Sequence, residues 1–328
     1  MRNYWHRYFF SPLGILLVTS SVLLFAQSST PAGKLSLADL QKQAAAGDPA
    51  AQNELGLRYR LGTDVDKDPA KAIPWFLKAA RQGYAKAYFN LGAAYYNGDG
   101  VNVNDQDSCV WFMLAADAGD QRGEEAVART RQSLTPPEMT HCEVLTATAY
   151  LTGDMVKQDY AKAMQWYQHA ANAGDGLACE RVAYFYDRGL GGVAQDKQQS
   201  FDWLKRSADL GYVPAIYELG MMYETGGVVH QDMSEAVKLY GQAAANGQPE
   251  AFVALGNLYA EGRGVKQDRQ KALMYYILGG TYGSPEGKHR ADEISAQMTP
   301  KQVASAKEEA AKYASAARHP LLLVRKQP

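Results

Sequence analysis

The sequence predicts an all-α fold built from stacked helix-turn-helix pairs, and three observations support this prediction. One pattern of about 36 residues recurs along most of the chain and is clearest in residues 246–280. Within each copy, apolar residues lie four apart, which places them on one face of a helix. Glycines separate the two helical segments of a copy, where the chain must turn. A fixed period of this size is typical of helical solenoids, in which neighbouring copies bury one another's apolar faces.

The first helix of a copy is represented by residues 249–261. Ala251, Leu255 and Tyr259 are four apart, so we expect them to share one face of this helix. Gly256 follows the leucine and has no side chain. We therefore expect a neighbouring helix to approach its backbone closely, and we expect the equivalent Gly92 and Gly220 to behave alike.

The turn and the second helix follow in the same copy. Gly262 and Gly264 end the first helix, because glycine adopts positive φ without steric cost. Asp268 is placed to cap the second helix by accepting hydrogen bonds from its first free amides. Ala272 and Tyr275 are then expected on the buried face of that helix.

The same features recur in chain order. The copies begin at seven glycines: Gly47, Gly83, Gly119, Gly174, Gly211, Gly247 and Gly283. Successive glycines are 36, 36, 55, 37, 36 and 36 residues apart. The predicted capping residues of the second helices are Asp68, Asn104, Asp159, Asp196, Asp232 and Asp268. The predicted core residues that follow seven positions later are Trp75, Trp111, Trp166, Trp203 (after one inserted residue upstream), Leu239 and Tyr275.

The one long spacing predicts that the repeats form two blocks. The sequences after Gly119 and after Gly283 both contain a helical segment followed by a Thr-Pro pair. Thr135 with Glu138, and Thr299 with Gln302, fit capping boxes. We therefore predict a first block at residues 35–140, opened by a helix that reaches Ala46, and a second block at 141–283. Capping helices and a disordered tail are expected at 284–328.

The N-terminal 26 residues have the features of an export signal. Arg2 and Arg7 precede an apolar run over residues 13–25, and Ala26 is a small residue before a possible cleavage point. The run is short for a membrane span. We predict a cleaved signal peptide or an uncleaved anchor at 1–26, a polar linker at 27–34, and a periplasmic or secreted location.

The recurring pattern AxxxLGxxYxxGxGVxxDxxKAxxWY resembles the Sel1-like repeat, a relative of the tetratricopeptide repeat. Ala87, Leu91, Gly92 and Tyr95 match it closely, and so do the equivalent residues after Gly211. The resemblance covers most of residues 47–283. It implies a right-handed α-solenoid that serves as an adaptor or scaffold in protein complexes.

The resemblance also suggests where a partner binds, because the first helices of related repeats line the concave surface. Residues beside the core positions would then face the groove, and several of them are aromatic, as peptide-binding anchors often are. These residues also suit the filling of gaps between repeats, and that alternative stays open. They are Asn53, Arg60, Phe89, Tyr96, Tyr184, Asp187, Tyr217, Met221, Glu224, Asn257 and Glu261.

The net charge of the chain and the motifs missing from its sequence reduce the number of functions that we expect. Without residues 1–26, 32 Lys and Arg side chains face 35 Asp and Glu side chains, which argues against a nucleic-acid partner. HExxH, Ser-x-x-Lys, phosphate-loop and Cys-x-x-Cys motifs are absent from the sequence. Asp64, Asp66 and Asp68 imitate the start of a calcium loop, but Pro69 and Trp75 replace its required glycine and glutamate. We expect no metal, no cofactor, no catalytic residue and no small-molecule substrate.

The three cysteines raise the question of a disulfide. Cys142 and Cys179 occupy nearly equivalent places in adjacent first helices, and an oxidising compartment permits a bridge. Helix axes are usually about 8–10 Å apart, whereas bridged Cα atoms lie within about 7 Å. A cysteine-rich branch of Sel1-like proteins carries a disulfide in each repeat and has been credited with β-lactamase activity, but this chain lacks that cysteine pattern.

The leading prediction is a non-enzymatic scaffold of the cell envelope that binds a protein or peptide on the concave face. An envelope hydrolase of the β-lactamase-like branch is one alternative, which requires a nucleophile with a partnered base. A structural regulator held at the membrane by an uncleaved leader is the other.

Overall fold

The computed structural model confirms the all-α class. It describes residues 35–324, and side chains for residues 35–315; the predicted leader and linker lie outside this part. Within it there are sixteen α-helices and no β-strand. The helices are α1 (Leu37–Ala45), α2 (Pro49–Leu61), α3 (Pro69–Ala80), α4 (Ala85–Asn97), α5 (Asp105–Asp117), α6 (Gln121–Ser133), α7 (Pro136–Thr152), α8 (Tyr160–Asn172), α9 (Gly176–Arg188), α10 (Lys197–Asp209), α11 (Val213–Thr225), α12 (Met233–Ala245), α13 (Pro249–Glu261), α14 (Arg269–Thr281), α15 (Pro285–Ser295) and α16 (Pro300–Val324).

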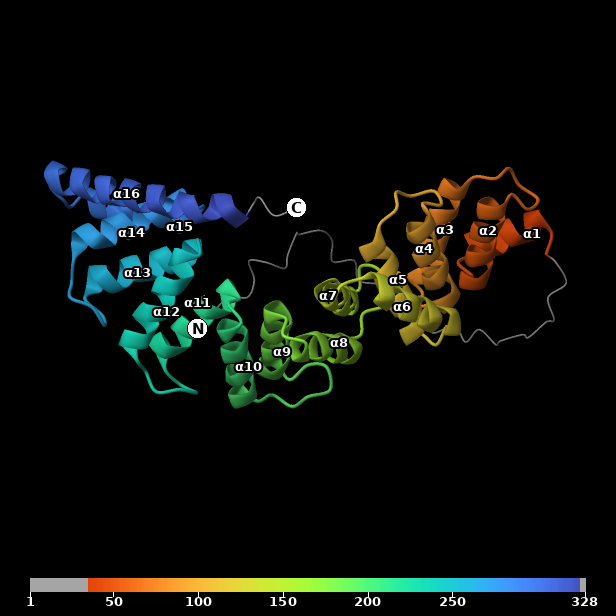
Figure 1. Cartoon of the computed structure of the whole chain (residues 1–328), viewed down its shortest axis with the longest axis horizontal. Helices are drawn as coiled ribbons and strands as arrows, with labels where there is room; N and C mark the ends of the chain where they lie inside the picture. The colour runs from red at the N-terminus through yellow and green to blue at the C-terminus, as the bar shows by residue number, and fades with distance from the viewer. Residues whose placement is uncertain (1–34, 325–328) are drawn as a thin grey trace. The chain divides into compact units, whose positions relative to one another are not determined.

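Six helical pairs form the repeats, and the two helices of each pair pack against each other (Figure 1). The pairs are α2–α3, α4–α5, α7–α8, α9–α10, α11–α12 and α13–α14. The second helix of each pair also packs against the first helix of the following pair. Helix α1 packs on α2 ahead of the first pair, as the sequence predicts.

The predicted N-caps are confirmed in all six second helices. Asp68, for example, accepts a hydrogen bond from the Lys71 amide at 3.1 Å, and Asp268 accepts from the amides of Gln270 and Lys271 at 3.0 Å each. Asn104, Asp159, Asp196 and Asp232 cap their helices in the same way. Each cap satisfies amides that have no partner inside the helix.

The capping residue also closes the turn through its own backbone. The amide of Asp268 donates to the carbonyl of Tyr259 at 2.8 Å, and the amide of Asp68 donates to the carbonyl of Tyr59 at 2.8 Å. The repeated tyrosine therefore marks the residue whose carbonyl receives this bond. Gly264 lies inside this turn with φ +70°, and a Cβ there would lie 2.7 Å from Cβ of Met233 in the preceding repeat. Only glycine fits this position without displacing the neighbouring helix.

The glycine of the Leu-Gly pair makes the predicted close contact, and its neighbour is an aromatic ring. A Cβ on Gly256 would lie 2.5 Å from Cδ1 of Tyr276, and one on Gly220 would lie 2.8 Å from Cε1 of Tyr240. Both tyrosines are almost fully buried, at 4% and 0% exposure. Phe76 and Phe112 occupy the same place beneath Gly56 and Gly92.

The rings beneath the glycines belong to the residues that directly follow the predicted core residues, so the sequence-based prediction is wrong by one position in these helices. Trp75 and Tyr275 are half-buried, whereas the residues that follow them lie beneath the glycines. Trp166 and Trp203 are also half-buried, whereas Trp111 and Leu239 are buried as expected. The physical reason is the helical angle: Tyr276 is four residues after the buried Ala272 and faces the first helix, whereas Tyr275 is turned by about 100° toward the edge of the pair.

The break in the period corresponds to helix α6 and the start of α7. Helix α5 contacts both α6 and α7, so α6 is an addition beside the stack. The predicted Thr135–Glu138 capping box is present, with the Thr135 amide donating to Glu138 at 2.8 Å. The Thr299 amide donates likewise to Gln302 at 3.0 Å. One hydrophobic cluster extends from Ala72 to Phe185, across the boundary predicted at residues 140 and 141.

Helix α16 packs on α14 and closes the C-terminal end of the stack. Its backbone continues to Val324, so it includes residues 319–324, for which the sequence predicts disorder. The Ala-rich run that precedes them contains no glycine to stop the helix.

Candidate functional site

The candidate binding residues follow one line along the first helices. Positions 6, 10 and 13 after the opening glycine of a copy are separated by four and three residues and share a helical face. We call these positions the first-helix stripe. Ten of the eleven predicted groove residues belong to it, and Glu261 lies one residue beyond.

In the first two repeats, the stripe residues mostly make contacts within the protein. Asn53 is only 4% exposed and accepts a hydrogen bond from the amide group of Asn90 at 2.8 Å, so it links two repeats and is no open groove residue. The ring of Phe89 lies 4.3 Å from the guanidinium of Arg122. Arg60 is 3.9 Å from Asp99.

Tyr96 differs from these neighbours because its side chain is 62% exposed. The preceding Tyr95 is half-buried. Tyr96 therefore has the exposure that the sequence predicts for a binding anchor.

Two glutamates form an acidic pair in α9 and α11, one on the stripe and one beside it. Glu180 lies at position 6 of its copy and is 3% exposed; its Oε2 is 3.3 Å from Nη1 of Arg181 but makes no hydrogen bond. Burial raises the pKa of Glu180. Glu218, one residue after position 6 in the next copy, has its pKa raised to about 8, mainly by burial and then by the charge of Glu180, while Arg181 opposes the shift. The guanidinium of Arg181 is thus a positive charge close to both carboxyl groups, those of Glu180 and Glu218.

The aromatic neighbours of the acidic pair are Tyr184 and Tyr217, both half-buried. The Tyr217 ring lies 5.5 Å from the ring of Tyr240, and the Tyr184 ring lies 6.2 Å from that of Phe185. Both tyrosines therefore pack partly against the core while keeping part of the ring exposed. Asp187, at position 13, forms an ion pair with Lys197 at 2.6 Å.

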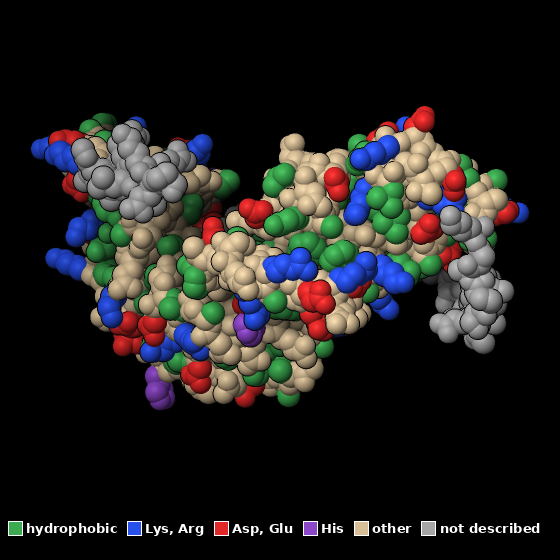
Figure 2. All heavy atoms as spheres, turned by 45° about the vertical axis from the view of Figure 1, so that its right-hand side comes forward, with side chains coloured by type: hydrophobic (Ala, Val, Ile, Leu, Met, Phe, Trp, Pro, Cys, Tyr) green, Lys and Arg blue, Asp and Glu red, His purple; other side chains and the backbone are tan. Residues whose placement is uncertain are grey.

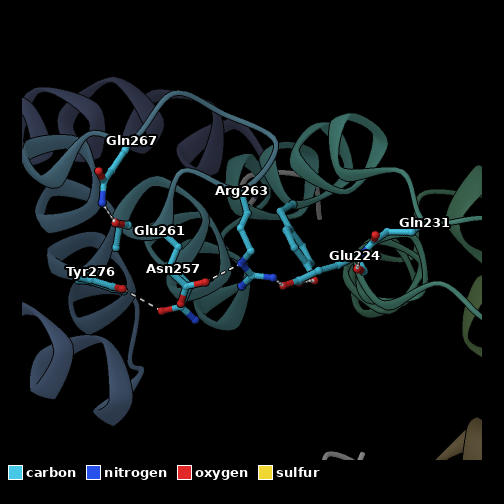
Figure 3. Close-up of polar contacts among 9 residues, drawn as sticks. Glu224, Gln231, Asn257, Glu261, Arg263, Gln267 and Tyr276 are labelled. Atoms are coloured by element: carbon cyan, nitrogen blue, oxygen red, sulfur yellow. Dashed lines mark hydrogen bonds and ion pairs between the residues drawn. The ribbon is translucent and has the colours of Figure 1, made fainter.

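A polar network continues the stripe in α11 and α13 (Figure 3). Glu224 accepts hydrogen bonds from the Tyr240 hydroxyl at 2.5 Å and from Nη1 of Arg263 at 2.8 Å. Arg263 also donates to Glu261 at 2.5 Å. Burial, and then the bond to Glu224, raise the pKa of Tyr240, so its hydroxyl stays protonated. Met221 lies half-buried one helical turn before Glu224.

The same figure shows a second tyrosine hydroxyl used in this way. The hydroxyl of Tyr276 donates to Asn257 at 2.8 Å, directly after the Leu-Gly pair of α13. The ring reaches this point because it passes beneath Gly256. Gln267 donates to the Ala260 carbonyl at 2.8 Å and so satisfies the end of the first helix. The contacts of Gly256, Tyr276 and Gln267 thus fix the position of this part of the stripe.

Sequence reasoning missed Glu180, Glu218 and the glutamines that end the first helices. Glu180 could have been found by its spacing, because it is six residues after Gly174 as Asn53 is six after Gly47. The glutamines form a Gln-Asp pair at the start of each later second helix, such as Gln231-Asp232. Burial of the glutamates depends on the neighbouring repeats and has no signal in the sequence.

A buried glutamate and an exposed histidine form a pair away from the stripe. Oε2 of Glu143 is 2.8 Å from Nδ1 of His169, beside a shallow hollow lined in part by Arg131 and Met139. No Ser, Thr or Cys side chain among residues 35–315 is hydrogen-bonded to this histidine. The hydrolase alternative would require such a side chain as its activated nucleophile.

Two surveys of the described residues bear on ligands and membranes. No three His, Cys, Asp or Glu side chains in this part of the chain are grouped to hold a metal ion. None of its helices combines the length and the apolar content needed to cross a bilayer. On the face shown in Figure 2, acidic and basic side chains are interspersed.

The repeated pairs, their Leu-Gly contacts and their caps define a helical-repeat protein. The Sel1 repeat family model matches residues 49–84, 85–120, 142–175, 176–212, 213–248 and 249–280. The chain belongs to the Sel1 repeat family.

Two relatives illustrate its neighbours in sequence. The chain is 28% identical over 213 residues to the chitin synthase regulator SKT5 of Saccharomyces cerevisiae, covering 61% of this chain and 28% of the relative. It is 42% identical over 65 residues to the secretory immunoglobulin A-binding protein EsiB of Escherichia coli O6:H1, covering 20% of this chain and 13% of that one. The match spans about a quarter to a third of the first curated relatives.

A solved structure supports the fold. The protective antigen c5321 of uropathogenic Escherichia coli, described as displaying an SLR fold, has a TM-score of 0.51 and 27% identity to this chain. The similarity covers 85% of this chain and 56% of the other.

Proposed function

We propose that this protein is a non-enzymatic adaptor that binds a basic segment of a protein partner along the first-helix stripe of α9 and α11. The acidic pair Glu180 and Glu218 is the observation that carries the proposal. These two carboxyl groups share Arg181, and Oε2 of Glu180 is buried without a hydrogen bond. Burial raises the pKa of both groups because their charged forms lack full compensation, and a lysine or arginine side chain from a partner would stabilise those charged forms.

The surroundings of the pair suit a peptide. Tyr184 and Tyr217 offer partly exposed rings on rigid helices, next to the carboxyl groups. Aromatic and cationic contacts at a fixed surface supply much of the affinity in peptide recognition. Tyr96 would add an anchor in the first block. The remaining predicted residues of the stripe hold the helices and shape this surface through the contacts described above.

The relatives are consistent with this class of function. The names of the relatives describe a regulator of chitin synthase and a protein that binds an immunoglobulin. We infer from the apolar run at residues 13–25 that this protein acts in the cell envelope, either released or held by its N-terminal segment. N-terminal sequencing of the protein from its host membrane and soluble fractions distinguishes these two forms.

The binding test uses two labelled peptides of equal length, one of alternating lysine and tyrosine and one of alternating glutamate and tyrosine. Fluorescence anisotropy measures their affinity for the wild-type protein, for the Glu180→Gln/Glu218→Gln double variant and for Glu308→Gln, an exposed control on α16. We expect the wild-type protein to bind the lysine peptide more tightly than the glutamate peptide. The double variant should bind the lysine peptide at least about tenfold more weakly, which corresponds to 1.4 kcal/mol of binding free energy. Equal binding by the double variant and the control would refute the proposed site.

A further inference from the structure

Two of the three cysteines lie together in the core. Cys109 on α5 and Cys142 on α7 are both 0% exposed and belong to one small cluster with Met113 and Met139. The two helices pack directly against each other. The structure holds both as free thiols.

This pair of neighbouring cysteines differs from Cys142 and Cys179, the pair that the sequence analysis considered for a disulfide. Cys179 on α9 belongs to a different hydrophobic cluster, and its thiol donates to the carbonyl of Ala171 at 3.7 Å. Equivalent positions in adjacent first helices therefore do not bring Cys142 and Cys179 together. The first helix α7 instead packs against the second helix of the preceding pair, α5, as in the other repeats, and Cys109 lies on that helix.

We propose that Cys109 and Cys142 form an oxidisable dithiol, which a small-molecule disulfide such as oxidised glutathione converts into a disulfide joining α5 to α7. The bridge would close the segment 110–141, which contains α6 and the start of α7. It would therefore fix the junction at which the regular repeat is interrupted. Cys179 remains a free thiol and serves as an internal reference.

The reaction balances as two successive thiol–disulfide exchanges. The Cys142 sulfur loses its proton and attacks the oxidant, which releases one thiolate and leaves a mixed disulfide on Cys142. The Cys109 sulfur then loses its proton, attacks Sγ of Cys142 and releases the second thiolate. The two protons pass to the released thiolates, so two protein thiols are oxidised while one disulfide becomes two thiols. The neighbouring thiol of Cys109 lowers the pKa of Cys142, which suits Cys142 to the first attack.

Burial determines when this reaction occurs. Neither sulfur is accessible in the folded state, so an oxidant of the size of glutathione reaches them during folding or when α6 and α7 separate from α5. We therefore expect fast bridging during refolding and slow bridging of the folded, reduced protein. Cys179 has no thiol neighbour and cannot form the bridge within one chain.

The test refolds reduced, denatured protein in a buffer of reduced and oxidised glutathione. Free thiols are then alkylated under denaturing conditions, and intact mass and non-reduced peptide maps are recorded. We expect one alkylated cysteine, Cys179, and a crosslinked peptide pair that contains Cys109 and Cys142. Cys179→Ser should show none alkylated and Cys109→Ala should show two. The bridged protein should keep the circular dichroism of the reduced protein and melt several degrees higher.

Three alkylated cysteines in refolded wild-type protein would overturn the proposal, as would a crosslink between Cys142 and Cys179. A bridge that forms only in a species with altered circular dichroism would also overturn it, because the native helices would then not accommodate the bond. If Cys109→Ala fails to fold, the peptide map of the wild-type protein still decides between these outcomes.

Discussion

The contact between Gly256 and the Tyr276 ring predicts an unusual sign for a glycine-to-alanine change inside a helix. Such a change normally stabilises a helix by about 0.8–1.0 kcal/mol. At Gly256 the new Cβ would lie 2.5 Å from Cδ1 and Cε1 of the ring. The ring is buried and must shift, at a cost of about 1–3 kcal/mol. Gly256→Ala should therefore be neutral to destabilising, by up to about 2 kcal/mol.

Gly241 supplies a matched control. It lies inside α12, and a Cβ built on it would meet no other atom within 4 Å. Gly241→Ala should gain only the helix propensity and stabilise the protein by about 0.8–1.0 kcal/mol. The two variants should thus differ by about 1–3 kcal/mol, which chemical denaturation monitored by circular dichroism resolves when their m-values agree.

A double-mutant cycle identifies the ring as the cause. In a Tyr276→Ala background, Gly256→Ala should recover the normal stabilising effect, because the atom that it would meet is gone. Equal stabilisation by Gly256→Ala and Gly241→Ala in the wild-type background would refute the close-contact argument. So would a failure of Tyr276→Ala to change the effect of the glycine substitution.

Three further outcomes are expected. Tyr96→Ala should change the unfolding free energy by less than about 0.5 kcal/mol, because the side chain is 62% exposed, while weakening peptide binding; a large drop in melting temperature would place this residue in the core. Asp268→Ala should cost about 1 kcal/mol by leaving the first amides of α14 without their cap, and Asp268→Asn, which keeps an acceptor, should cost less in the same denaturation assay. The pKa of Glu218 is raised to about 8, so the folded state keeps a proton that the unfolded chain releases above about pH 4.3. The free energy of unfolding should therefore fall as pH rises from about 5 to 8 and level off above that. Glu218→Gln should flatten this pH dependence, and an unchanged slope in the variant would contradict the burial of the carboxyl group.

The sequence predicts this fold well because its main determinants are local. A capping aspartate such as Asp268 acts on amides two and three residues away, and a turn glycine acts on its own backbone. Both effects repeat with the same period, so each copy supports the assignment of the others. The capping boxes at Thr135 and Thr299 were predictable for the same reason.

Side-chain burial was less predictable because it depends on which repeat lies next. Asn53 has the position of a groove residue, yet Asn90 in the following repeat covers it. Glu180 is a charged residue whose burial no periodic pattern indicates. Cys109 lies near Cys142 because α5 packs against α7, and the α6 insertion places 32 residues between the two cysteines in the sequence.

The Leu-Gly contact also links the fold to the chemistry of the first-helix stripe. Because glycine lets the ring of the second helix pass beneath the first helix, the end of that ring determines which group reaches the stripe. Tyr240 and Tyr276 deliver hydroxyls there, bonded to Glu224 and Asn257, whereas the phenylalanines beneath Gly56 and Gly92 deliver none. The residue at this buried position thus supplies a polar group to the stripe in the last two repeats, α11–α12 and α13–α14. Substitution of Tyr240 or Tyr276 should alter both the free energy of unfolding and the affinity for a partner. A loss of affinity in such a variant is therefore assigned to the surface only after its unfolding free energy has been measured.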